Sequence, residues 1–223
     1  EVVRDVEQHV RLAKSDYVVD IGANDGTMLA YFPATTRRVG IEPAKNIEWG
    51  HLDPSMKMVN DYFSQATLEK ALPGEKIKVF TSCAMFYDLE DPNSFVATIK
   101  AALAPDGMWC IQLSYLPLMF KNMNFYDICN EHLEYYSLHT LQNLMARHHL
   151  TIIDASTNGV NGGSARVFIT HNESQPEPSK NFKKLFAEEE QLALYDVATY
   201  QQFYKEMTQL KEKVRDYIIT KKQ

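Results

Sequence analysis

An adjacent carboxylate and imidazole, Glu131 and His132, stand in a segment rich in aromatic and polar side chains. Histidine is well suited to take up a proton near neutral pH, and a neighbouring carboxylate can orient it or act as a base itself. Asn130 can donate to a carbonyl oxygen or cap a turn, and Tyr136 offers a hydroxyl or a packing ring. We take Asn130, Glu131, His132 and Tyr136 as candidate catalytic residues.

A second chemical signal lies upstream, where an apolar run ends in Asp20-Ile21-Gly22-Ala23-Asn24-Asp25-Gly26. Gly22 and Gly26 remove side chains, so a ligand can approach the backbone closely. The two glycines have GxxxG spacing, which differs from the GxGxxG dinucleotide fingerprint. The alternative interpretation is a plain turn between a strand and a helix.

The next apolar run ends in Gly40-Ile41-Glu42-Pro43. An acidic residue at the end of a second strand can accept hydrogen bonds from both hydroxyls of a ribose. Glu42 taken by itself would be interpreted as a surface carboxylate. Because it follows the glycine motif by about twenty residues, the ribose interpretation is favoured.

Strand-length apolar runs alternate with helix-period segments over residues 1–155. This alternation predicts an α/β, Rossmann-like fold whose sheet is mostly parallel, with the ligand at the carboxyl ends of the strands. The seven strands expected are Tyr17–Ile21, Arg38–Glu42, Lys57–Asn60, Lys76–Ser82, Gly107–Leu113, Leu150–Ala155 and Arg166–Thr170.

Helices are expected from Gly26 or Thr27 to Phe32, over Asp91–Leu103, and over Leu138–His148. Asp91 and Ser137 are the N-caps expected for the last two. A turn is expected at 104–107, from its Pro-Asp-Gly sequence.

A polar linker with two prolines is expected at residues 171–180, and a helical extension without Gly or Pro at 181–223. The apolar residues of the extension recur at helical spacing, so it presents a packing surface. That surface can contact this domain, a second subunit in a homodimer, or a flanking domain. We divide the chain into a domain at 1–172 and a linker with a helical C-terminal extension at 173–223.

Composition and charge exclude several classes of protein. The 223 residues are 45% hydrophobic with a net charge of −6, which disfavours a disordered chain or a nucleic-acid binder. No apolar run reaches membrane-spanning length, and the N-terminus lacks a signal-peptide core. Three scattered cysteines favour a reducing, cytoplasmic setting and no metal site. The missing initiator Met indicates a processed or excised piece.

The ordered motifs resemble class I methyltransferases that use S-adenosylmethionine (SAM). They are DIGANDG, GIEP, Asn60-Asp61-Tyr62-Phe63, Thr81-Ser82-Cys83-Ala84-Met85 and the LAPDG turn before the fifth strand. The resemblance covers residues 1–172 and implies SAM as the cofactor, with S-adenosylhomocysteine (SAH) as product. It implies cofactor contacts from Asp20, Gly22, Asn24, Asp25, Gly26, Glu42, Pro43, Asp61, Tyr62, Phe63, Ser82, Cys83 and Met85.

A longer run, Asn130-Glu131-His132-Leu133-Glu134-Tyr135-Tyr136-Ser137-Leu138, is followed downstream by Gly162-Gly163-Ser164-Ala165-Arg166. Together they resemble the sugar C-methyltransferases of deoxysugar and polysaccharide biosynthesis, which act on nucleotide-linked 4-keto-6-deoxysugars. The resemblance implies that Glu131 and His132 lie at the acceptor, with His132 the favoured base. We expect substrate contacts from Tyr115, Tyr135, Ser164 and Arg166, since the guanidinium of Arg166 suits a diphosphate.

The chain departs from that family pattern at several positions. Asn130 stands where His is usual, Cys129 where Tyr is frequent, and Met85-Phe86-Tyr87-Asp88 where many relatives carry Ala-His. The family's cysteine-rich zinc domain is absent, and the chain stops where a second Rossmann-like domain would begin.

The leading hypothesis is a SAM-dependent methyltransferase acting on a sugar or nucleotide-sugar, with His132 and Glu131 as the base pair. One alternative is an O-methyltransferase of a polysaccharide or small-molecule hydroxyl. Another is a SAM-binding module without catalysis.

Overall fold

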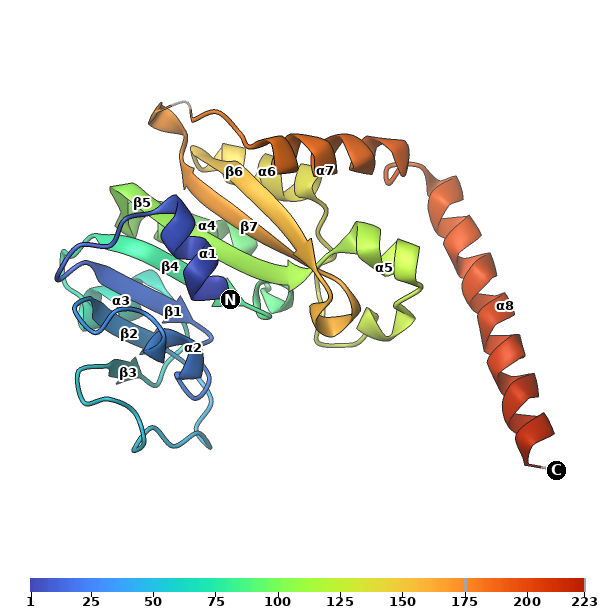
Figure 1. Cartoon of the computed structure of the whole chain (residues 1–223), viewed down its shortest axis with the longest axis horizontal. Helices are drawn as coiled ribbons and strands as arrows, with labels where there is room; N and C mark the ends of the chain where they lie inside the picture. The colour runs from blue at the N-terminus through green and yellow to red at the C-terminus, as the bar shows by residue number, and fades with distance from the viewer. Residues whose placement is uncertain (175, 223) are drawn as a thin grey trace.

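The computed structural model describes residues 1–174 and 176–222, and seven strands within them form one sheet (Figure 1). The order is β3-β2-β1-β4-β5-β7-β6, and β7 runs antiparallel to both of its neighbours. The strands are β1 (Tyr17–Ile21), β2 (Arg37–Ile41), β3 (Lys57–Val59), β4 (Ile77–Cys83), β5 (Leu103–Ser114), β6 (Leu150–Asn158) and β7 (Ser164–His171). This topology confirms the predicted α/β, mostly parallel fold.

Helices cover both faces of the sheet. They are α1 (Val2–His9), α2 (Thr27–Ala30), α3 (Gln65–Ala71), α4 (Pro92–Ala102), α5 (Leu116–Asn122), α6 (Leu138–Arg147), α7 (Lys180–Gln191) and α8 (Val197–Lys221). Short 3-10 turns are η1 (Phe86–Asp88), η2 (Phe125–Asp127), η3 (Val160–Gly162) and η4 (Asn172–Ser174). The expected caps of α4 and α6 are confirmed, since the side chains of Asp91 and Ser137 accept bonds from backbone N–H groups.

Three helices were not predicted from the sequence: α1, α3 and α5. Helix α1 has no side-chain hydrogen bond at its N-cap, Glu1, so the usual start signal is missing. It is held instead by tertiary packing, because Val3 and Val6 are buried against the sheet. The turn expected at 104–107 lies inside β5 as a bulge. Leu103 pairs with Ile77 and Met108 pairs with Val79, so the four residues between Leu103 and Met108 stand opposite a single residue of β4.

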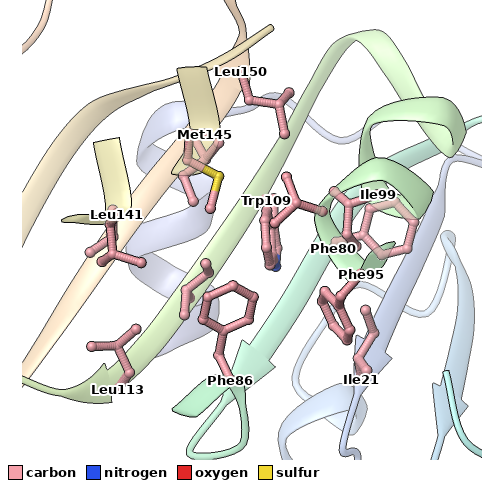
Figure 2. Close-up of a cluster of buried hydrophobic side chains, with 14 of the residues drawn as sticks. Ile21, Phe80, Phe86, Phe95, Ile99, Trp109, Leu113, Leu141, Met145 and Leu150 are labelled. Carbon is pink, nitrogen blue, oxygen red and sulfur yellow. The ribbon is translucent and has the colours of Figure 1, made fainter. Parts of the chain in front are cut away.

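Alternate residues of the central strands build two separate apolar cores, one on each face of the sheet. Val18, Val79 and Cys110 face α1 and α2, whereas Val19, Phe80 and Trp109 face the opposite side. Figure 2 shows Trp109 at the centre of the second core, among side chains from β1, β4, α4 and α6. Two-sided burial explains why these strands are nearly continuous apolar runs.

The C-terminal extension consists of two helices that behave differently. Helix α7 packs against β6 and α6 and buries Phe182. Helix α8 extends away from the sheet (Figure 1), and its main aromatic contact is Phe203 stacked on Phe120 at 4.4 Å. In the described part of the chain, none of the helices combines the length and the apolar composition that crossing a bilayer requires.

A buried carboxylate on α7, Glu189, joins the extension to the sheet domain. Its oxygens accept bonds from the backbone N–H groups of Leu138 and His139 at the start of α6, and from the Tyr115 hydroxyl at 2.5 Å. The His139 ring lies 2.7 Å from the same carboxylate. Glu189 therefore caps α6 and anchors the end of β5 together.

We predict that Glu189→Ala destabilises the fold by about 3 kcal/mol, because it leaves a buried hydroxyl and two helix N–H groups without an acceptor. Urea denaturation followed by circular dichroism measures this change. Glu188→Ala, which removes the exposed neighbouring carboxylate, is the matched control and should change stability by less than about 0.5 kcal/mol. Equal effects of the two substitutions would contradict the anchoring role.

Candidate active site

A cleft of about 1180 Å³ opens at the carboxyl ends of β1, β2 and β4. Parallel strands present these ends along one edge, which is where the sequence predicted a ligand. Eleven of the predicted contact residues line the cleft: Asp20, Gly22, Asn24, Asp25, Glu42, Pro43, Tyr62, Phe63, Cys83, Met85 and Arg166. Gly26, Asp61 and Ser82 lie beside it without lining it.

The turn after β1 approaches the cleft through backbone rather than side chain. Gly22 has φ +72°, and its N–H donates to the Ile41 carbonyl oxygen at 2.9 Å. A Cβ atom added at Gly22 would lie 3.2 Å from Cγ of Met85, which covers the turn. Conformation and space therefore both favour glycine at this position.

Glu42 is held rigidly where β2 ends. One carboxylate oxygen accepts from the N–H of Asn24 and the other from that of Ala44, each at 2.9 Å. Each oxygen keeps a further lone pair, so the carboxylate can still accept from two vicinal hydroxyls. The side chain is nearly buried yet lines the cleft. This arrangement fits a ribose.

Asp20 is a buried acid at the floor of the cleft. The Thr81 hydroxyl donates to one of its oxygens at 2.6 Å. Burial, opposed by the Thr81 hydrogen bond and aided by the nearby charge of Glu42, raises the pKa of Asp20 to about 7. A bound cation would favour the ionised form of this carboxyl.

Other predicted cofactor residues divide between the cleft and the core. Tyr62 is 75% exposed at the rim, while Phe63 packs 4.7 Å from Phe95. The Asp61 carboxylate accepts from the Tyr62 N–H and the Thr67 hydroxyl, and Asp61 does not line the cleft. Its contact with adenine remains a prediction. Ser82 is buried and accepts from the indole of Trp109.

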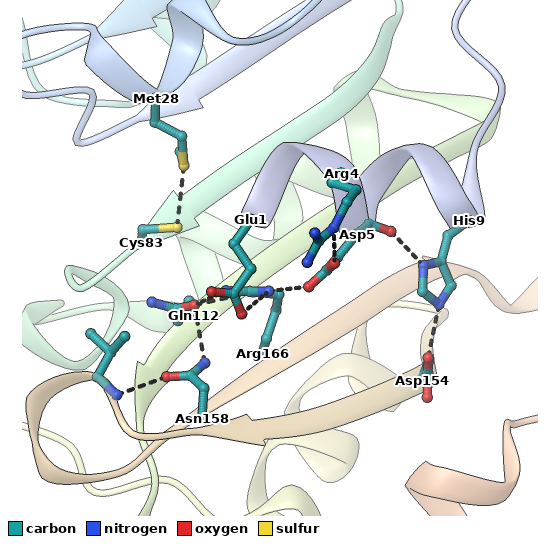
Figure 3. Close-up of polar contacts among 11 residues, drawn as sticks. Glu1, Arg4, Asp5, His9, Met28, Cys83, Gln112, Asp154, Asn158 and Arg166 are labelled. Atoms are coloured by element: carbon teal, nitrogen blue, oxygen red, sulfur yellow. Dashed lines mark hydrogen bonds and ion pairs between the residues drawn. The ribbon is translucent and has the colours of Figure 1, made fainter.

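Cys83 borders the cleft from the end of β4. Burial, with the charge of Asp20, raises the pKa of its thiol to about 12. The thiol is therefore neutral, and it lies 3.8 Å from the sulfur of Met28 on α2 (Figure 3).

Arg166 on β7 lines the cleft but is fully engaged within the protein (Figure 3). Its guanidinium pairs with Asp5 and Glu1 of the N-terminal segment and donates twice to Gln112 on β5. The side chain is buried. Its contact with a substrate diphosphate stays a prediction, whereas its contacts here tie α1 to the sheet.

The segment with Glu131 and His132 is joined to the cleft through η1. The backbone N–H groups of Leu133 and Glu134 both donate to the Tyr87 carbonyl oxygen, at 2.9 and 3.0 Å. The His132 ring lies 4.2 Å from the Tyr87 ring. Asp88, the next residue of η1, lines the cleft. Sequence reasoning missed Asp88 as a site residue, although it is a carboxylate just beyond the end of a predicted strand.

The remaining predicted acceptor residues lie away from the cleft lining. Tyr115 and Tyr136 are buried and form a β-bridge with each other, and the Tyr136 ring packs against Phe86. Ser164 is buried and donates to the Val160 carbonyl oxygen. Asn130 and Glu131 are exposed, and the Tyr135 hydroxyl donates to the Asp127 carbonyl oxygen. Their catalytic and substrate roles remain predictions.

Two family models together match most of the chain. Residues 4–155 match the family described as "Methyltransferase domain", and residues 159–223 match "C-methyltransferase C-terminal domain". The chain belongs to the methyltransferase-domain family. As a class I methyltransferase it uses SAM as cofactor, and the cleft described above fits that molecule.

The methyltransferase is similar to C-methyltransferase NovU of Streptomyces niveus, with 27% identity over 213 residues. The alignment covers 95% of this chain and 51% of NovU, so the chain spans about half the length of that curated relative.

Solved structures share the fold at low identity. The LepI complex with SAM has a TM-score of 0.57 at 11% identity, covering 76% of this chain and 46% of LepI. The 1,6-didemethyltoxoflavin-N1-methyltransferase of Burkholderia thailandensis, with bound SAH, has a TM-score of 0.57 at 16% identity, covering 76% of each chain.

Among residues 1–174 and 176–222, no group of three or more His, Cys, Asp or Glu side chains is arranged to hold a metal ion. SAM itself supplies an activated methyl group. The side chains of the methyltransferase must therefore orient that group, exclude water and manage the acceptor's proton.

We predict that Gly22→Ala raises the Kd for SAM about tenfold, because a Cβ there displaces Met85 and fills the close approach to the backbone. Isothermal titration calorimetry measures this Kd. Gly74→Ala is a matched control, since Gly74 has φ +70° but open space around it. Both variants should lose about 1 kcal/mol of stability from backbone strain, but only Gly22→Ala should weaken SAM binding. Unchanged SAM affinity in Gly22→Ala would contradict this assignment.

We predict that SAM binding becomes tighter as the pH rises from 6 to 8. Asp20 ionises through this range, and its carboxylate then attracts a ligand of net positive charge. Titration calorimetry at several pH values tests this, with SAH, which lacks the sulfonium charge, as the comparison ligand. Asp20→Asn should flatten the dependence for SAM. A dependence that persists in this variant would assign it to another group.

Proposed function

We propose that this chain takes part in the SAM-dependent methylation of a sugar carbon, with a nucleotide-linked 4-keto-6-deoxysugar as the acceptor. The observation that carries the proposal is the attachment of the His132 segment to η1, directly beside the SAM cleft. The similarity to NovU, a C-methyltransferase, supports transfer to carbon.

In the proposed reaction, the imidazole of His132 removes the proton next to the acceptor's ketone. The electron pair of that C–H bond forms an enolate, whose oxygen needs a hydrogen-bond donor. Asn130 is the donor we assign, because it is exposed and adjacent in the same segment. The enolate carbon then forms a C–C bond to the methyl group, and the electrons of the broken S–C bond stay on sulfur.

The charges of the cleft bear on how the acceptor is held. Six carboxylates line it, from Glu1, Glu7, Asp20, Asp25, Glu42 and Asp88, against the guanidinium groups of Arg4 and Arg166. Arg166 is already paired with Asp5 and Glu1. This part of the protein therefore suits a cationic cofactor better than a diphosphate. We propose that the sugar end of the acceptor enters the cleft, while its diphosphate lies outside it.

Methyl transfer from isotope-labelled SAM to a panel of nucleotide-linked 4-keto-6-deoxysugars, read by mass spectrometry, tests the proposal. A labelled sugar, with the methyl group placed on carbon by NMR, is the expected result. A methyl group on oxygen would favour an O-methyltransferase instead. SAM binding without labelling of any sugar would contradict the proposed acceptor.

We predict that His132→Gln lowers the rate of methyl transfer by about a hundredfold or more, because it removes the base. SAM affinity should be unchanged, since His132 does not line the cofactor cleft. His148→Gln is the control, because His148 lies at the end of α6 and contacts Asn93. A wild-type rate in His132→Gln would exclude His132 as the base.

A further inference from the structure

A buried carboxylate oxygen in the loop that carries His132 lacks a hydrogen-bond donor. Asp127, the last residue of η2, is only 6% exposed, and its Oδ2 atom accepts no hydrogen bond from any residue in 1–174 or 176–222. Burying a carboxylate without a donor is unfavourable, so such a group is usually protonated or matched by a nearby cation.

The backbone around Asp127 is well held, so its position is defined. Its N–H donates to the Asn124 carbonyl oxygen, and its own carbonyl oxygen accepts from the Tyr135 hydroxyl at 3.3 Å. Tyr135 lies three residues after His132, whose ring packs against that of Tyr87. Asp127 and His132 therefore belong to one loop that folds back on itself beside η1.

Several titratable groups surround this loop: Tyr87, Asp88, Asp127, Cys129, Glu131 and His132. Burial raises the pKa of Asp127, and the charge of His132 lowers it. On the cleft side, burial and the charge of Glu131 raise the pKa of Asp88, and the charge of His132 lowers it. Burial and the charges of Asp88, Asp127 and Cys129 raise the pKa of Tyr87 to about 12, so its hydroxyl is neutral. His132 is the member of this group that can carry a positive charge.

We propose that Asp127 is the positioning residue of His132: once the acceptor is bound, its Oδ2, which has no donor in this structure, accepts the ring N–H that faces away from the acceptor. As His132 takes up the acceptor's proton at its other ring nitrogen, the carboxylate of Asp127 balances the new positive charge. Catalytic hydrogen bonds of this kind often tighten only when substrate binds. Glu131 is exposed and makes no hydrogen bond to His132, so Asp127 replaces it as the carboxylate partner. The catalytic part of this proposal rests on the proposed function, whereas the pairing does not.

The pairing is tested without turnover by a carbon-13 NMR titration of the aspartate carboxyl groups. We expect the pKa of Asp127 to be higher in His132→Gln than in the wild type, because the neighbouring positive charge is lost. Glu134→Gln, which neutralises an exposed carboxylate of the same loop, is the control and should leave the pKa of Asp127 unchanged. An Asp127 pKa that does not respond to His132→Gln would overturn the proposal.

The catalytic role is tested with Asp127→Asn on the full chain. We expect kcat for methyl transfer to fall at least roughly tenfold, with KM for SAM unchanged and partial recovery in Asp127→Glu. Glu134→Gln should keep the wild-type kcat. A melting temperature and a SAM Kd near those of wild type establish that Asp127→Asn is folded. A wild-type kcat in folded Asp127→Asn would overturn the role, whereas a wild type that methylates no sugar would overturn only the proposed function.

Discussion

The parallel register of β1 between β2 and β4 is the constraint on which the cofactor cleft depends. It aligns Asp20 with Gly40 on one side and with Thr81 on the other. All three strands therefore end at the same edge, where the Gly22 turn, Glu42 and Cys83 meet. Side chains on both faces of these strands are buried, so a shift of the register by one residue would exchange the two cores. The geometry of the cleft is thus maintained by the packing of the whole sheet.

The acceptor half of the proposed site depends on much weaker restraints. Around His132 itself, two backbone hydrogen bonds to the Tyr87 carbonyl oxygen and one ring contact connect the chain to η1. Segments of this kind can adjust when a ligand binds, because few buried contacts oppose the movement. In the proposed reaction, this division would hold the cofactor in a rigid half and leave the acceptor half free to adjust.

Buried charges connect the outer elements to this framework. Arg166 joins α1 to β7 and β5, and Glu189 joins α7 to α6 and β5. Each has several partners, which offsets the cost of burying its charge. Arg166 also shows why a lone residue type is a weak guide to function. A guanidinium binds carboxylates as readily as phosphates. The carboxylates that bind Arg166 come from Glu1 and Asp5, which are far from it in the sequence.

The sequence by itself determined where the strands lie along the chain, because burial on both faces of the sheet gives each central strand a continuous apolar run. It also located the edge of the sheet where the cleft opens, because Gly22 and Glu42 directly follow the ends of β1 and β2. Only the tertiary structure decided the state of residues whose partners are distant in the chain. Tyr115 and Tyr136 are core residues because they face Glu189 and Phe86, and α1 forms because the sheet buries its valines. Asp127 is held in the loop that carries His132 because its carbonyl oxygen accepts from the Tyr135 hydroxyl, a contact that the sequence pattern does not reveal.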